Sequence, residues 1–239
     1  MRKNLLNEGK TTRYFKYAIG EIILVVIGIL IALQINTWND YRKKNNLKAS
    51  YVASLKKDLA ADIVYFETQI EMDSIDFAKM MSLSARLSNS LTTKDTLVKI
   101  ARYEFLPFTD VNNELNMSTY NSLITTGNID VFDAYTSESL LKFNNLQLNS
   151  NSIMDRNDEL YFNSVVVYRN KYPFNSARNG INGPFMDSFW ETLDENELKS
   201  DFNGILTAKL SMLSSSILDR KGLLLKTEEM LITLNGNHD

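Results

Sequence analysis

The chain has no cysteine, three prolines, nine glycines and one histidine among its 239 residues. Without cysteine there is no disulfide, no thiolate nucleophile and no cysteine-bound zinc, so stability must come from packing. The only histidine, His238, stands one residue before the last, which excludes a Ser-His-Asp triad, a histidine zinc site and a histidine pH switch. The shortage of proline and glycine beside abundant Leu, Lys, Asn, Ser and Glu favours an all-α fold.

Charge is distributed unevenly along the chain. Residues 1–16 contain five basic side chains and one acidic side chain, out of totals of 26 and 29. The remainder therefore holds 21 basic and 28 acidic residues, a net charge of −7. A negative main domain disfavours nucleic acid as a partner.

One apolar run near the start of the sequence has the length of a membrane span. Residues 22–33 contain no polar side chain, and their apolar neighbours extend the run to about eighteen residues, or roughly 27 Å of helix. Tyr17 before the run and Trp38 after it are typical interfacial anchors. No pair of small residues suited to a signal peptidase follows Leu33, so we favour an uncleaved transmembrane helix over residues 17–38 above a cleaved signal peptide or a buried soluble helix.

The distribution of Lys and Arg around the run predicts the topology. The tail over residues 1–16 carries five such residues close to the apolar edge, and the first twenty positions after Ile35, where the apolar run ends, carry four. With one uncleaved span the usual outcome is a cytoplasmic tail. We therefore predict a cytoplasmic segment over 1–16 and an extracytoplasmic helical domain over 39–239.

Small and polar residues share one face of the expected span. On a helical wheel, Gly20 and Glu21 fall on the same side as Gly28 and Ala32, and the last two have the small-xxx-small spacing that lets helices approach closely. One interpretation is an association seam with Glu21 bonded across it or titrating in a proton path. The other is that Glu21 snorkels to the headgroups and the glycines are incidental.

Two segments resemble a known family. The first is GEIILVVIGILIALQINTWND, residues 20–40, and the second is TYNSLITTGNIDVF, residues 119–132. Both are similar to segments of an uncharacterised family of bacterial single-span envelope proteins, a domain of unknown function. The resemblance implies an inner-membrane anchor and a mostly helical periplasmic domain, and it implies no activity, cofactor or catalytic residue.

Beyond the span, apolar spacings of three and four predict an elongated antiparallel bundle that continues the transmembrane helix. The first stripe runs from Val52 to Leu87, with a kink or a change of packing partner near Asp73. Shorter helices are expected over 94–106, ended by Pro107, and over 118–126, ended by Gly127. A third long helix is expected over 137–172, and an irregular region over 173–197. The last helix, 198–234, has a stripe of Phe202, Leu206, Leu210, Leu213, Ile217, Leu224 and Leu231.

The remaining polar clusters give weak signals for chemistry. Oxygen ligands for calcium occur in two groups, which are Asp155, Asp158 and Glu159, and Asp110, Asn112 and Glu114. Neither group has the glycine turn and distal Glu of a calcium-binding loop, so a solvated surface is the simpler explanation. The turn between Gly180 and Gly183 does not join a strand to a helix, which argues against a phosphate loop. We predict no catalytic, metal or cofactor site.

An aromatic group lies in the expected irregular region, made of Phe174, Phe185, Phe189 and Trp190. Such a group either closes the end of a bundle or forms an exposed contact surface. Closing the bundle is the preferred interpretation, and exposure would make the group a partner site.

These observations favour a membrane-anchored, non-enzymatic interaction or scaffold protein of the bacterial envelope, with the lipid bilayer and a protein partner or a second copy as its contacts. One alternative is an extracytoplasmic sensory or ligand-binding module acting through a separate cytoplasmic partner. Another is a subunit of an ion-driven or transport assembly that uses Glu21. An enzyme is the least favoured class.

Overall fold

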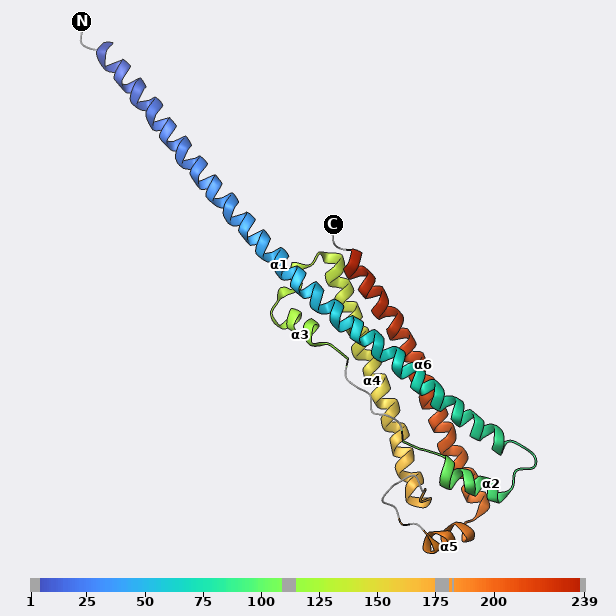
Figure 1. Ribbon diagram of the computed structural model, residues 1–239. Coiled ribbons are helices and arrows are strands. Elements are labelled where there is room, and N and C mark those ends of the chain that lie inside the picture. Colours follow the sequence, from blue (N-terminus) through green and yellow to red (C-terminus); the bar gives the residue numbers. More distant parts are fainter. Residues whose placement is uncertain (1–4, 109–114, 175–180, 182, 237–239) are drawn as a thin grey trace. The chain divides into compact units, whose positions relative to one another are not determined.

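The computed structural model describes residues 5–108, 115–174, 181 and 183–236, with side chains from Arg13 onward. Within these ranges it contains six α-helices and no strand (Figure 1). The all-α prediction is confirmed. The chain divides into two compact units, Met1–Ala53 and Ser54–Asp239, which are described separately.

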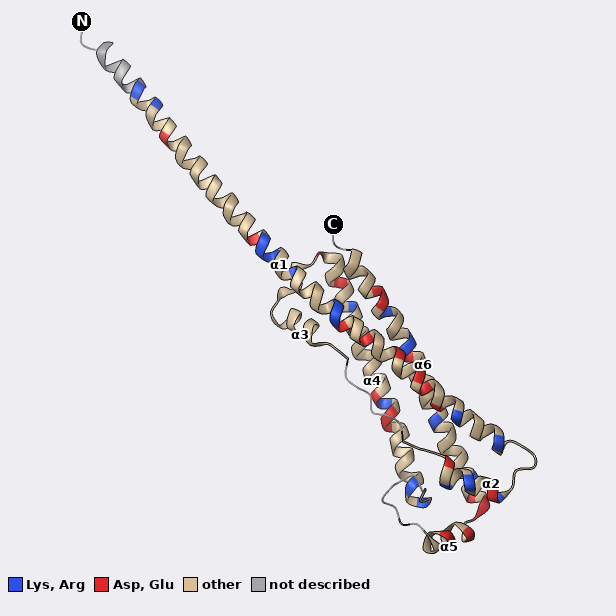
Figure 2. Cartoon of the chain, in the orientation of Figure 1, with Lys and Arg blue, Asp and Glu red and all other residues tan. Residues whose placement is uncertain are grey.

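The first unit is part of helix α1, which runs from Leu5 to Leu87. Its large apolar side chains between Ile19 and Ile35 are each 47–74% exposed, on every side of the helix. Figure 2 shows this stretch free of charge between Glu21 and Asp40. A helix that is apolar all round and not buried by its own chain has the character of a membrane span.

The second unit is built on three long helices, which are α1 from Ser54 onward, α4 (Ala134–Lys171) and α6 (Glu195–Gly236). Helices α4 and α6 pack along each other in opposite directions. Lys171 at the end of α4 lies 2.9 Å from Asp201 near the start of α6, and Asn157 donates to Ser215 at 3.1 Å. The antiparallel arrangement of these two helices follows from these pairs.

Short elements connect the long helices. They are α2 (Lys94–Lys99), the π-helical turn η1 (Ile100–Glu104), α3 (Ser118–Thr125), the 3₁₀ turn η2 (Asn128–Val131) and α5 (Pro184–Thr192). Gly127 has φ of 70°, the left-handed conformation that ends α3 as expected. The Asp133 carboxylate caps α4 by accepting from the Thr136 backbone N–H at 2.9 Å.

One expectation about these elements was wrong. The region 173–197 is not all irregular, because α5 forms directly after Gly183, and Pro184 occupies its first turn, where a missing N–H costs nothing. Helix α1 continues without a break through Asp73, and its packing partners change there as expected, from the smaller cluster that holds Phe66 to the main cluster that holds Met80. Asp73 faces a buried cation on α6, described below.

Most of the core of the second unit lies in one cluster, to which α1, α2, η1, α4, α5 and α6 all contribute. A smaller cluster joins Phe66, Met154 and Leu223 to Leu115. The expected stripe on α6 is confirmed in part: Phe202, Leu206 and Leu213 are buried, whereas Leu210, Ile217, Leu224 and Leu231 are half-buried at the edge of the buried face. The buried face also includes the polar residues Lys209, Ser216, Arg220 and Thr227. A prediction that takes only apolar residues as buried does not find them.

Candidate functional site

The residues singled out on the span lie on the surface of the first unit. Gly20, Glu21, Gly28 and Ala32 are all exposed, and a Cβ added to either glycine would meet no atom within 4 Å. The face is therefore open to lipid or to another helix. Glu21 stands on it as the one acidic residue between Arg13 and Asp40.

The aromatic group of the predicted partner surface is divided by the fold. Trp190 is 2% exposed, and Phe174 and Phe189 are half-buried against the main core cluster. Phe185 is 74% exposed. Three of the four aromatics thus close the bundle near α5, and only Phe185 presents its ring to solvent.

The structure describes one of the two carboxylate groups that were considered as calcium ligands. Asp155, Asp158 and Glu159 lie on α4 and are exposed or half-buried. No group of three or more His, Cys, Asp or Glu residues able to hold a metal ion occurs in the part of the chain that the structure describes. Asp110, Asn112 and Glu114 lie outside the described residues, as does Gly180 of the glycine turn.

The most distinctive polar feature is one that the sequence did not suggest, the fully buried Lys209 on α6. Its ammonium group donates to the Leu106 carbonyl at 2.5 Å, approaches the Phe108 carbonyl at 3.4 Å and lies 3.0 Å from the Asp76 carboxylate of α1. Tyr161 of α4 donates to the intervening Pro107 carbonyl at 2.7 Å. We call residues Leu106–Phe108 the strap, because they are held against the long helices through their main-chain oxygens.

A second buried cation, Arg220, pairs with Asp73 about one turn before Asp76 on the same face of α1. Arg220 is 4% exposed, and the Asp73 side chain is 17% exposed. Helices α1 and α6 are therefore joined by two ion pairs in which the cation is buried and the carboxylate lies at the edge of the core. Pairs of this kind position helices more than they stabilise them, because desolvation offsets most of their attraction.

A third buried cation, Arg102, lies on η1 and pairs with an exposed carboxylate of α5. Its guanidinium group donates to Asp187 of α5 at 2.7 Å and lies over the rings of Tyr103 and Trp190, at 4.9 and 5.8 Å from their centres. The contact ties α5 to the core through charge and cation–π attraction.

Asp62 is a buried acid on α1, 1% exposed. Its Oδ1 accepts from the Asn116 backbone N–H at 3.1 Å and from the Asn116 amide at 2.7 Å, while Oδ2 has no hydrogen-bond partner among the described residues. Burial raises the pKa of Asp62, the bonds from Asn116 oppose that rise, and the nearby Asp58 adds to it. Asp62 thereby fastens the segment that leads into α3 to α1 at Asn116.

A surface hollow of about 250 Å³ lies where α1 turns into α2. Its floor is apolar, formed by Leu87, Leu97, Phe202 and Leu206. Its rim carries hydroxyl groups and two longer polar side chains, from Ser84, Ser88, Thr92, Thr93, Lys199 and Asn203. An apolar floor with convergent polar groups is the usual form of a small-ligand site.

The described chain is thus an all-α protein with one helix that is long and apolar enough to cross a membrane, followed by a helical domain whose buried charges join its elements. It belongs to a family of unknown function, DUF6090, whose model matches residues 21–172. The match begins within the apolar run and ends at Tyr172, just after α4. Comparisons with curated proteins and with solved structures found no match.

Proposed function

We propose that this protein is a single-pass anchor of the bacterial inner membrane, with residues 1–16 in the cytoplasm and a periplasmic helical domain that acts by binding protein. The observation that carries the anchor is the exposure of every large apolar side chain from Ile22 to Leu33. Trp38 with Arg42 stacked over its ring at 5.8 Å supports a membrane–water boundary at that point.

The interaction role rests on how the domain uses its buried charges. Asp62, Arg102, Lys209 and Arg220 each bind another element of the same chain. Buried ionisable groups at catalytic sites are instead aimed into a cleft where a substrate binds. A bundle fixed internally by ion pairs offers its outer surface, together with the face around Gly28, for contact with a second copy or an envelope partner.

Native mass spectrometry of the full-length protein, extracted gently from its own membranes, tests this role. A defined homo-oligomer or a stoichiometric second protein is the expected result. A clean monomer without a companion would overturn it. Fusion of a periplasm-active reporter to each end of the chain tests the topology, and activity at the N-terminal end alone would reverse it.

The hollow between α1, α2 and α6 favours a second candidate, a ligand-binding sensory domain. Its hydroxyl rim and its apolar floor suit a small neutral polyol or sugar. Chemical shifts of isotope-labelled protein titrated with monosaccharides test this candidate. Shifts confined to residues around Thr92 and Asn203, abolished in Asn203→Leu, would move the sensory role ahead of the interaction role.

The transport alternative depends on Glu21. In a proton or ion path, Glu21→Gln would abolish the function of the assembly, whereas a simple anchor would tolerate it. Proton or ion flux across vesicles that contain the gently purified protein separates the two, because a transport subunit should lose its flux in Glu21→Gln, whereas a pure anchor supports no flux with either residue.

A further inference from the structure

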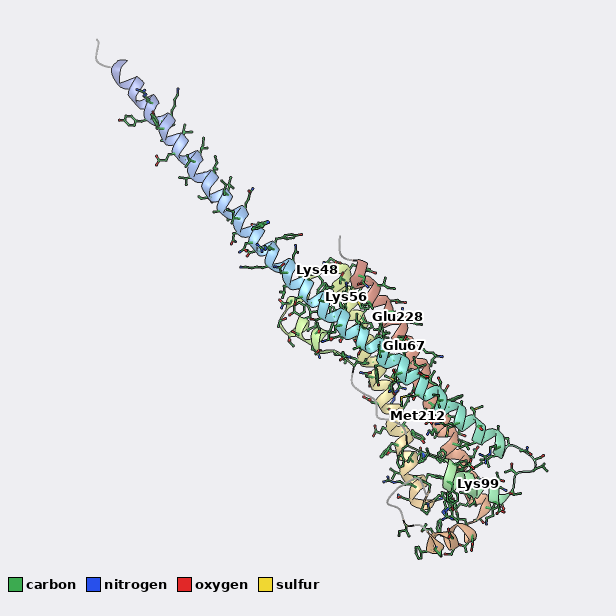
Figure 3. The ribbon with its side chains drawn as sticks, in the orientation of Figure 1. Lys48, Lys56, Glu67, Lys99, Met212 and Glu228 are labelled. Atoms are coloured by element: carbon green, nitrogen blue, oxygen red, sulfur yellow. The ribbon has the colours of Figure 1, made fainter. Side chains whose placement is uncertain are left out.

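Helices α4 and α6 leave a groove on the side of the second unit away from the strap. A hollow of about 360 Å³ marks its middle, between Leu160 of α4 and Ser211 of α6. Between them lie the small or short polar residues Asn157, Ser164, Ala208 and Ser215, together with the larger side chains of Tyr161 and Met212. Met212, labelled in Figure 3, lies on the stretch of α6 that lines this hollow.

The hollow lies on two exposed apolar stripes with heptad spacing, which we call the outer stripes. On α4 the stripe is Leu146, Ile153, Leu160 and Val167, and on α6 it continues from Ser211 as Leu218, Leu225 and Ile232. Leu160 and Val167 are 62% and 64% exposed, and the three α6 residues are 60–71% exposed. Positions seven apart stay within about 20° on a helix, so each stripe follows one face.

Gly222 lies between Leu218 and Leu225 in the middle of α6. Glycine weakens a helix, and an added Cβ at Gly222 would meet no atom within 4 Å. Packing within the chain therefore does not require a glycine there. A glycine at this point would let another helix approach closely.

We propose that the outer stripes are the self-association surface of this protein, occupied by a second copy of the same chain around a two-fold axis along the bundle. This rests on the proposed function, in the form in which the protein binds a second copy of itself, and it adds which surface makes that contact. In this arrangement α4 of each copy packs against α6 of the other, and the two grooves cover each other.

The exposed apolar area is sufficient for such a pair. Mutual burial of the outer stripes by two copies would remove roughly 1,000 Å² or more of surface, the scale that a specific interface requires. The heptad spacing of both stripes also matches knobs-into-holes packing between long helices.

The register also gives complementary charge. Within one chain, Asn157 of α4 pairs with Ser215 of α6, and Lys171 pairs with Asp201. Because the helices are antiparallel, residues at the same level along the bundle have numbers that add up to about 372. A two-fold axis along the bundle keeps these levels between copies. Lys142 of one copy then lies beside Glu229 of the second copy at the rim, and Leu146 lies level with Leu225 in the centre.

The first test compares the oligomeric state of three full-length variants in mild detergent. Leu218→Glu with Leu225→Glu should raise the dimer dissociation constant at least tenfold, and Gly222→Leu, which favours the α6 helix, should do the same while raising the thermal midpoint. Val64→Glu with Ile75→Glu, at α1 side chains of similar exposure, 62% and 51%, is the matched control and should leave the dimer intact.

The outcomes separate this surface from the proposed function. A wild-type dimer that survives the groove variants would overturn the outer stripes and leave self-association standing. A monomeric wild type would overturn both. A wild type that carries a different protein, lost only in the groove variants, would support an interaction role and overturn the second copy as occupant.

Because the chain has no cysteine, single cysteines test the register directly. A copy with Leu146→Cys mixed with a copy with Leu225→Cys should form a disulfide-linked heterodimer on mild oxidation. The mixture of Val64→Cys with Leu225→Cys is the control and should not. Cross-linking of Leu225→Cys only to itself would overturn the α4-to-α6 arrangement.

Discussion

The ammonium nitrogen of Lys209 lies 3.0 Å from Oδ2 of Asp76, although the lysine has no exposed surface and the carboxylate belongs to another helix. The Asp76 side chain is 29% exposed. The pair therefore has one partner that water reaches and one that water does not reach. This asymmetry predicts how each substitution behaves.

Asp76→Ala should lower the free energy of unfolding by about 3–5 kcal/mol, because it leaves a buried ammonium group without a counter-charge. Urea unfolding of the full-length protein in detergent, followed by circular dichroism, measures this. Asp155→Ala on the exposed side of α4 is the control and should change stability by no more than about 0.5 kcal/mol. Equal effects of the two substitutions would contradict the role of the pair.

Asp73 and Arg220 should behave as a coupled unit. Arg220→Met and Asp73→Ala should each destabilise the domain, and the double variant should lose less than the sum, with a coupling of about 0.5–3 kcal/mol. The same unfolding measurement on the four proteins of the cycle gives this energy. Strict additivity would mean that the observed contact between them contributes nothing.

Asp62 should make the domain more stable as the pH falls. Its pKa in the folded state is raised by burial, so the folded chain binds the proton more readily than the unfolded chain. The gain therefore begins as the pH falls through the raised pKa and is complete below the unfolded value. Asp62→Asn, which keeps the acceptor for Asn116, should be more stable than wild type at pH 7 and lose that advantage at pH 4.

Thermal unfolding of both proteins from pH 4 to pH 8 checks this prediction. Asp155→Asn serves as the control, since its difference from wild type should stay nearly constant over the range. A difference between Asp62→Asn and wild type that is also constant with pH would show that Asp62 does not titrate there.

The span should associate through its small face. Gly28→Leu should weaken association of the isolated span in a membrane reporter assay about tenfold, because the added side chain separates the helices. Val26→Leu, which enlarges the opposite face, should have little effect. If both variants keep full signal, the small residues do not form an association seam. The alternative interpretation then holds, in which the glycines are incidental and Glu21 extends to the lipid headgroups.

The local parts of the fold were predictable because their signals lie within a few residues. Gly127 ends a helix wherever a left-handed residue is needed, and the apolar spacing around Leu140 and Val165 identifies α4 without knowledge of its neighbours. Helix α5 was not predicted, although Gly183 and Pro184 are ordinary helix start signals. The glycines and asparagines just before them favour irregular structure and mask that signal.

The buried ion pairs were not predictable by the same reasoning. Asp73 was recognised only as an interruption of an apolar stripe, since its partner Arg220 is 147 residues away in the chain. Lys209 and Arg220 are eleven residues apart, three helical turns, so they share a face with the apolar residues around Leu213. A cation repeated on an apolar face is the signal that was available, but the sequence does not say which acid it meets.

The contact between Lys209 and the strap constrains the length of the strap more than its amino-acid sequence. Lys209 binds carbonyl oxygens, which every amino acid supplies, so the side chains of Leu106 and Phe108 are free to change without altering the bond. The spacing of the crossing is not free, because one inserted residue would displace both oxygens and the Pro107 carbonyl bound by Tyr161. Relatives that keep a lysine at this position are therefore expected to tolerate varied chemistry in the strap but not varied length.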